Sequence, residues 1–102
     1  MKSVVVQYKT KSDRGDDNQR LVEKVFEELS ERDPGGLRYA TLRLADGVSF
    51  AHIAVVKTAD GSNPIGQISA FAEFQREIGD RCADPPAAED ATVIGSYRFF
   101  SD

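Results

Sequence analysis

The dipeptide Asp46-Gly47 lies between two alternating runs of β-forming residues, LRYATLRLA before it and VSFAHIAVV after it. This pattern predicts a β-hairpin closed by a two-residue type I′ turn, since aspartate and glycine tolerate the positive φ angles that the turn requires. With Asp46 and Gly47 as the loop, Thr41 pairs with His52 and Leu37 pairs with Val56. The hairpin therefore determines which side chains share a face of the sheet.

One face of the predicted hairpin gathers polar side chains among apolar ones. Its polar members are Tyr39, Thr41, Arg43 and His52, and its apolar members include Phe50, Ala54 and Val56. The opposite face carries Ala40, Leu42, Leu44, Ala51, Ile53 and Val55. Because the second strand, residues 48 to 56, is largely apolar on both faces, it is expected to lie in the centre of a sheet.

The rest of the chain supplies two helices and two further strands. Residues 3 to 10, SVVVQYKT, predict another central strand, and residues 16 to 32 predict an amphipathic helix that ends at the sequence DPGG. A second helix is expected from position 63 or 69 to about Cys82, with Phe71, Phe74 and Ile78 on its apolar stripe. After the break at Asp84-Pro85-Pro86, residues 91 to 100, ATVIGSYRFF, predict the last strand.

The order β-α-β-β-α-β predicts an α+β fold of the ferredoxin-like kind, formed by residues 1 to 102 as a single domain. Its four-stranded antiparallel sheet would have the first and third strands in the centre and two helices on one face. The other face would expose large apolar groups, which favours a homodimer formed through the sheet. A monomer with a modest apolar surface is the alternative.

Composition and missing motifs exclude several classes of partner and enzyme. The net charge of −4, without a basic stripe, argues against nucleic acid and membrane as partners. The single cysteine, Cys82, excludes an internal disulfide, and a short apolar run near the N-terminus is too brief for a signal peptide, so a cytoplasmic protein is expected. Phosphate loops, dinucleotide fingerprints and metal-binding motifs are missing, so neither a cofactor nor a metal is expected.

The segments SVVVQYKT, DNQRLVEKVFEELSE, GLRYATLRLADGVSFAHIAVV and SAFAEFQREIGDRC resemble, in order and spacing, the dimeric α+β barrel superfamily. They are most similar to small proteins related to antibiotic biosynthesis monooxygenases. The resemblance implies a homodimeric barrel of two sheets with a ligand pocket in each monomer between helices and sheet. It does not extend to the residues of haem-degrading members, because the chain has no tryptophan, no histidine in its second helix, and only Gln7 as an amide on the first strand.

The candidate site is the polar group on the hairpin. In a monooxygenase of this kind without cofactor, a phenol or enol is deprotonated and its anion reacts with oxygen. His52 would be the proton acceptor, and Tyr39, Thr41, Arg43 and Phe50 would bind a small aromatic or polyketide-like substrate. The alternative is a non-catalytic dimeric module that binds a small hydrophobic ligand, in which His52 is a structural histidine with its ring nitrogens hydrogen-bonded. The sequence leaves open whether the His52 face lies under the helices or against a partner sheet.

Overall fold

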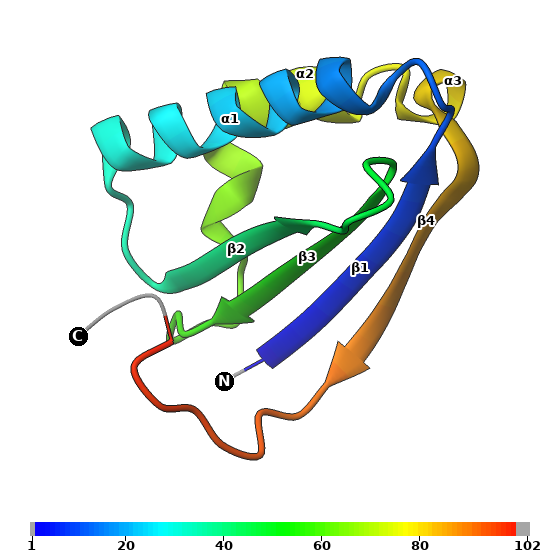
Figure 1. Cartoon of the computed structure of the whole chain (residues 1–102). Helices are drawn as coiled ribbons and strands as arrows, with labels where there is room; N and C mark the ends of the chain where they lie inside the picture. Colours follow the sequence, from blue (N-terminus) through cyan, green and yellow to red (C-terminus); the bar gives the residue numbers. More distant parts are fainter. Residues whose placement is uncertain (1, 100–102) are drawn as a thin grey trace.

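The structure, a computed structural model, describes residues 2–99. Its elements follow one another in the predicted β-α-β-β-α-β order (Figure 1). They are β1 (Lys2–Thr10), α1 (Gly15–Arg32), β2 (Leu37–Arg43), β3 (Ser49–Val56), the 3-10 helix η1 (Pro64–Gln67), α2 (Ser69–Gln75), α3 (Ile78–Arg81) and β4 (Cys82–Ala91). The predicted α+β, ferredoxin-like class is confirmed.

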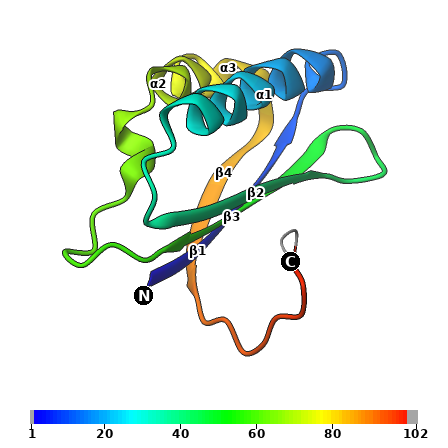
Figure 2. The ribbon, with the colours of Figure 1, turned by 90° about the vertical axis from the view of Figure 1, so that its left-hand side faces the viewer.

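The four strands form one antiparallel sheet in the order β2-β3-β1-β4. The prediction that the first and third strands are central is confirmed, in agreement with their apolar side chains on both faces. All the helices lie on one face of the sheet, as the two views in Figures 1 and 2 show. That face carries alternate residues of β1 and β3, among them Tyr8 and His52, which both belong to the buried interior.

The hairpin has the predicted register, but the predicted type I′ turn is wrong. Thr41 pairs with His52 and Leu37 with Val56. Of the two expected turn residues only Gly47 has a positive φ, at 77°. The Gly47 N–H donates to the carbonyl of Leu44, and the Asp46 carboxylate accepts from the N–H groups of Val48 and Ser49. Because the Asp46 side chain binds the backbone that follows it, a longer loop forms in place of the two-residue turn.

The last strand lies earlier in the chain than predicted. β4 spans Cys82–Ala91, whereas residues 92–99 form no strand and Ile94 is 99% exposed. As an edge strand that pairs only with β1, β4 tolerates proline, and its register shifts between Gln7 and Lys9, opposite Pro85-Pro86. Position 100, the end of the predicted strand, lies outside the described residues.

The second helix is interrupted where a continuous helix was expected. Arg76 is extended and Glu77 has a φ of 61°, so the helix breaks into α2 and α3. The side chain of Arg81 satisfies backbone carbonyls at the break, because it donates to those of Phe74 and Arg76. In a continuous helix these carbonyls would accept backbone N–H groups four residues later.

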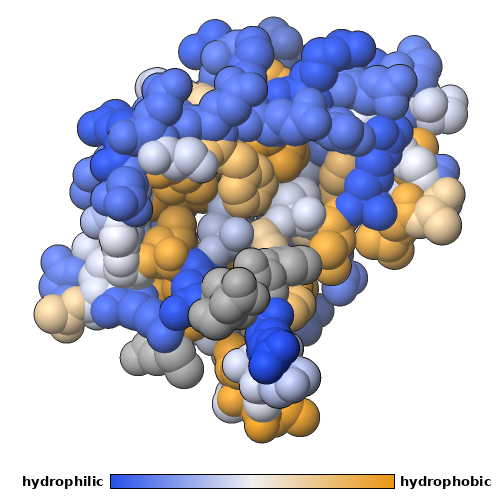
Figure 3. All heavy atoms as spheres, turned by 60° about the vertical axis from the view of Figure 1, so that its left-hand side comes forward, coloured by the Kyte–Doolittle hydropathy of each residue, from blue (hydrophilic) through white to orange (hydrophobic). Residues whose placement is uncertain are grey.

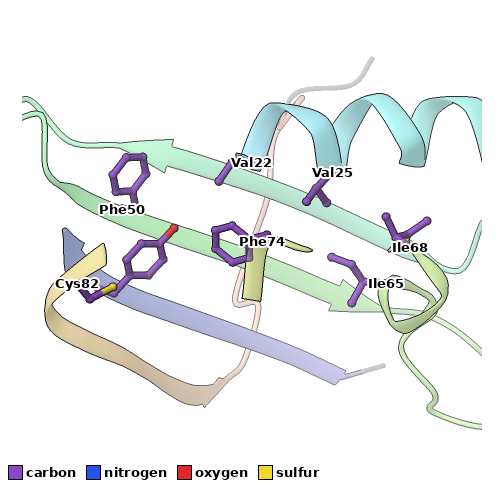
Figure 4. Packing of buried hydrophobic residues seen from close by; sticks show 8 residues of the cluster. Val22, Val25, Phe50, Ile65, Ile68, Phe74 and Cys82 are labelled. Carbon is purple, nitrogen blue, oxygen red and sulfur yellow. The ribbon is translucent and has the colours of Figure 1, made fainter. Parts of the chain in front are cut away.

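The hydrophobic core lies between the helices and the sheet (Figure 4). Its buried members come from both central strands, from both helical regions and from the start of β4. They are Tyr8, Val22, Val25, Phe50, Ile65, Ile68, Phe74 and Cys82. The tight packing continues to the start of α1, where a Cβ atom on Gly15 would lie 2.4 Å from the Gly47 carbonyl oxygen. This core holds α1 and α2 against the sheet. The cavity lies beside the core, where the helices leave part of the sheet uncovered.

Candidate functional site

A cavity of about 460 Å³ lies between the helices and the sheet. Figure 3 shows hydrophobic side chains gathered beneath the hydrophilic outer surface of the helices. The cavity is lined by Val4, Val6, Tyr8, Tyr39, His52, Ala54, Asn63, Ile65, Phe71, Phe74, Gln75, Ile78 and Pro86. A mostly apolar wall with a few polar groups is typical of a site for a small aromatic or lipophilic ligand, and the volume lies in the range of such sites.

His52 lies under the helices, in the wall of this cavity, and is 5% exposed. Its Nε2 is 2.8 Å from the Tyr8 hydroxyl, and its Nδ1 is 2.6 Å from the Tyr39 hydroxyl and 3.1 Å from Thr41 Oγ1. Both ring nitrogens are thus hydrogen-bonded within the protein. The question that the sequence left open is answered: the His52 face is the helix-covered face.

The hydrogen bonds continue from Tyr8 into a buried polar network. Arg81 Nε donates to Asn18 Oδ1 over 3.2 Å, and Asn18 Nδ2 donates to the Tyr8 hydroxyl over 2.8 Å. Because the Tyr8 oxygen already accepts from Asn18, its own hydrogen is free to donate to His52 Nε2. His52 then carries its hydrogen on Nδ1 and donates it toward Tyr39, so every member of the network has a partner. The hydrogen bond from Arg81 thus sets the donor and acceptor directions along the network as far as His52.

Burial keeps the imidazole and the two phenols of this network uncharged at neutral pH. It lowers the pKa of His52 to about 4 and raises the pKa of Tyr39 to about 12. Burial likewise raises the pKa of Tyr8, against the opposing effect of its hydrogen bond from Asn18. The imidazole is therefore a neutral base, and both phenols keep their protons.

The structure brings three of the predicted site residues together and places two elsewhere. Tyr39 and His52 line the cavity, and Thr41 contacts His52 from the neighbouring strand. Phe50 stacks on Tyr8 in the core, with ring centroids 5.5 Å apart, and does not line the cavity. Arg43 donates to the Gly47 carbonyl and to the Asp16 and Gln19 side chains, at the junction of the hairpin loop with α1. Binding roles for Arg43 and Phe50 stay predictions.

Three further residues of the site, Tyr8, Asn18 and Arg81, were not predicted from the sequence. Asn18 is fully buried and lies four residues before Val22 and seven before Val25, so it continues the apolar stripe of α1. A polar residue on such a stripe is a usable signal, because a buried amide needs a partner. Tyr8 gave a weaker signal, as one aromatic residue in a strand apolar on both sides. Arg81 gave none, since its position depends on the break between α2 and α3.

Two other properties bear on function. Within residues 2–99, no group of three or more histidine, cysteine or acidic residues is arranged to hold a metal ion. None of the helices in the described part of the chain is long and apolar enough to cross a membrane.

Comparisons with known proteins give structural neighbours but no match by sequence. No protein-family model matches the chain, and no curated protein matches it. A putative antibiotic biosynthesis monooxygenase from Nitrosomonas europaea superposes with a TM-score of 0.76 at 20% identity, covering 93% of this chain and 100% of that one. A second putative one, from Caulobacter crescentus, has a TM-score of 0.72 at 16% identity, covering 92% of this chain and 90% of that one.

A variant of SnoaB, a cofactor-independent oxygenase from Streptomyces nogalater, is also similar. It has a TM-score of 0.67 at 16% identity, and the match covers 93% of this chain and 94% of that one. At these identities the likeness concerns the fold. The resemblance seen in the sequence is thus borne out in three dimensions: the chain has the ferredoxin-like fold of structures named as antibiotic biosynthesis monooxygenases.

Proposed function

We propose that this protein is a cofactor-independent monooxygenase that acts on a small aromatic or polyketide-like phenol or enol. The observation that carries the proposal is the cavity itself, with an apolar wall, about 460 Å³ in volume, into which Tyr8, Tyr39 and His52 bring hydrogen-bonding groups. The oxygenase name of one structural neighbour supports the reaction class. In such a reaction the substrate supplies the electrons that reduce oxygen, so the protein must bind the substrate and remove a proton from it.

The proton path runs through Tyr8 to His52. Tyr8 lines the cavity, and its hydroxyl is 2.8 Å from His52 Nε2. The ligand's hydroxyl proton moves to the Tyr8 oxygen as the Tyr8 proton moves to Nε2, so the ligand becomes an anion and His52 an imidazolium. Burial lowers the pKa of the ring to about 4, and a ligand anion beside the ring opposes this effect by favouring the protonated form.

Oxygen uptake tests this proposal. Purified protein without added metal, flavin or haem is mixed with one- to three-ring phenols and enolisable ketones, beginning with anthrone. We expect uptake above the uncatalysed rate, a loss of at least about tenfold in His52→Gln, and no loss in Lys24→Gln, an exposed substitution on α1. Uptake that matches the uncatalysed rate for the whole panel contradicts the proposal, and full activity in His52→Gln removes His52 from the mechanism.

A second candidate function is a dimeric module that binds a small hydrophobic ligand without catalysis. It is favoured by the hydrogen bonds at both nitrogens of His52, which leave no free lone pair facing the cavity. Under this function the panel compounds bind, His52→Gln changes their affinity little, and oxygen uptake stays at the uncatalysed rate.

A further inference from the structure

The guanidinium of Arg81 is a buried charge without an acidic partner. Arg81 is 2% exposed, and none of the ion pairs within residues 2–99 includes it. Its partners are all neutral: Asn18 Oδ1 at 3.2 Å, the Arg76 carbonyl at 3.1 Å, the Phe74 carbonyl at 2.6 Å and the Phe74 ring at 5.3 Å. Burying a cation without a counter-ion destabilises the folded state, so a functional role for this side chain is worth considering.

Hydrogen bonds connect the charged group of Arg81 to a residue of the cavity wall. Arg81 holds the Asn18 carbonyl, which turns the Asn18 N–H group toward the Tyr8 oxygen, and Tyr8 lines the cavity. The nearby titratable groups Tyr8, Tyr39, His52 and Cys82 are all kept neutral by burial. The outer charges are those of Arg14 and Glu77, which act on Arg81, and of Asp84, which acts on Cys82; all three side chains reach solvent. The interior beside the cavity therefore carries a net positive charge.

We propose that Arg81, acting through Asn18 and Tyr8, makes the cavity select the deprotonated form of an acidic aromatic ligand. The inference rests on the proposed function for the identity of the ligand site. When an anion binds, the Tyr8 hydroxyl turns its hydrogen toward the ligand oxygen. His52 then takes the tautomer with hydrogen on Nε2 and donates to Tyr8, while Tyr39 donates to Nδ1, as the 2.8 Å and 2.6 Å separations allow. Arg81 and Asn18 are positioning residues, since neither lines the cavity.

The test measures the ionisation of a bound dye. 4-Nitrophenol absorbs at different wavelengths as phenol and as phenolate, so absorbance against pH at saturating protein gives the affinity ratio of the two forms. With a unit charge three hydrogen bonds away, we expect the phenolate to bind about tenfold more tightly than the phenol. 4-Nitrotoluene, which has a methyl group in place of the hydroxyl, serves as the uncharged control ligand.

Two sets of variants separate charge from structure. Asn18→Asp supplies Arg81 with a carboxylate, which cancels its charge, and it also removes the N–H donor to Tyr8, so the phenolate preference should disappear and 4-nitrotoluene affinity should stay within about twofold. Arg81→Lys should retain the preference and Arg81→Gln should lose it, and thermal melts verify that each variant folds. A purely structural role for Arg81 predicts no difference in preference between the folded variants.

Equal binding of phenol and phenolate by the wild type overturns the inference, as does absence of binding of the dye at millimolar concentration. A preference that persists in both Asn18→Asp and Arg81→Gln also overturns it. Because the assay involves no turnover, phenolate selection without oxygen uptake leaves this inference standing and refutes the oxygenase. Oxygen uptake without phenolate selection does the reverse.

Discussion

The buried state of His52 predicts a loss of stability in mild acid. The folded protein holds this imidazole at a pKa of about 4, compared with 6.5 for an unperturbed histidine. Below pH 6.5 the unfolded chain therefore binds a proton that the folded chain rejects, and the free energy of unfolding falls as the pH is lowered from 6.5 toward 4. Between about pH 7.5 and about pH 5.5 the calculated loss is about 1.3 kcal/mol.

Urea unfolding followed by circular dichroism measures this loss directly. His52 is the single histidine of the chain, and the acidic groups with strongly lowered pKa values, such as Glu28 at about 2, lose their stabilising effect in more acidic solution. We expect wild-type protein to lose about 1.3 kcal/mol over this range and His52→Gln to lose almost nothing. An unfolding free energy of the wild type that is equal at the two pH values would show that His52 is not buried as a neutral ring.

Three further predictions concern the cavity, the hairpin and the outer face of the sheet. Ala54→Leu fills part of the cavity and should weaken binding of 4-nitrotoluene at least about tenfold, as measured by equilibrium titration. The control substitution Ala72→Leu, at an exposed position, should leave the affinity unchanged. Equal affinities of the two variants would place the ligand elsewhere. Arg43→Ala removes the hydrogen bonds that join the hairpin loop to α1 and should lower the unfolding free energy by about 1 kcal/mol. Arg20→Ala removes one exposed ion pair and should lower it less. Similar losses in the two variants would contradict this prediction. Leu42, on the outer face of the sheet, is 41% exposed, so we propose a homodimer formed through the sheet. Sedimentation should give the mass of two chains for the wild type and of one chain for Leu42→Glu. A wild-type monomer at micromolar concentration would contradict the homodimer.

Much of the fold follows from patterns local in sequence. The hairpin register from Leu37 to Val56 follows from the turn residues and the alternation around them, and the central place of β1 follows from apolar residues on both of its faces; the structure has both features. The last strand was misplaced because its β-forming residues, 91 to 100, have strong local preference, whereas Pro85-Pro86 is compatible with a strand only at a sheet edge. Edge position is a property of the assembled sheet and is invisible in the segment itself.

The candidate site was predictable in part for the same reason. The contacts of His52 with Tyr39 and Thr41 lie within one hairpin, so register alone brings them together. The contacts through Tyr8, Asn18 and Arg81 join three elements distant in sequence, and Arg81 reaches the network because the second helix breaks before it. No periodicity predicts a side chain that replaces a helix's own hydrogen bonds.

The central claim, that a ligand binds in the cavity between the helices and the sheet, can be tested by locating the binding site. In protein with ¹³C-labelled alanine methyl groups, titration with 4-nitrophenol is followed by NMR. Ala54 lines the cavity, whereas Ala51, on the same strand, lies outside its lining, and an alanine-to-glycine variant at each position assigns the two signals. Binding in the cavity should give a saturable ring-current shift at Ala54 and little change at Ala51. A shift at Ala51 with Ala54 unmoved would contradict it, because the ligand would then bind on the outer face of the sheet.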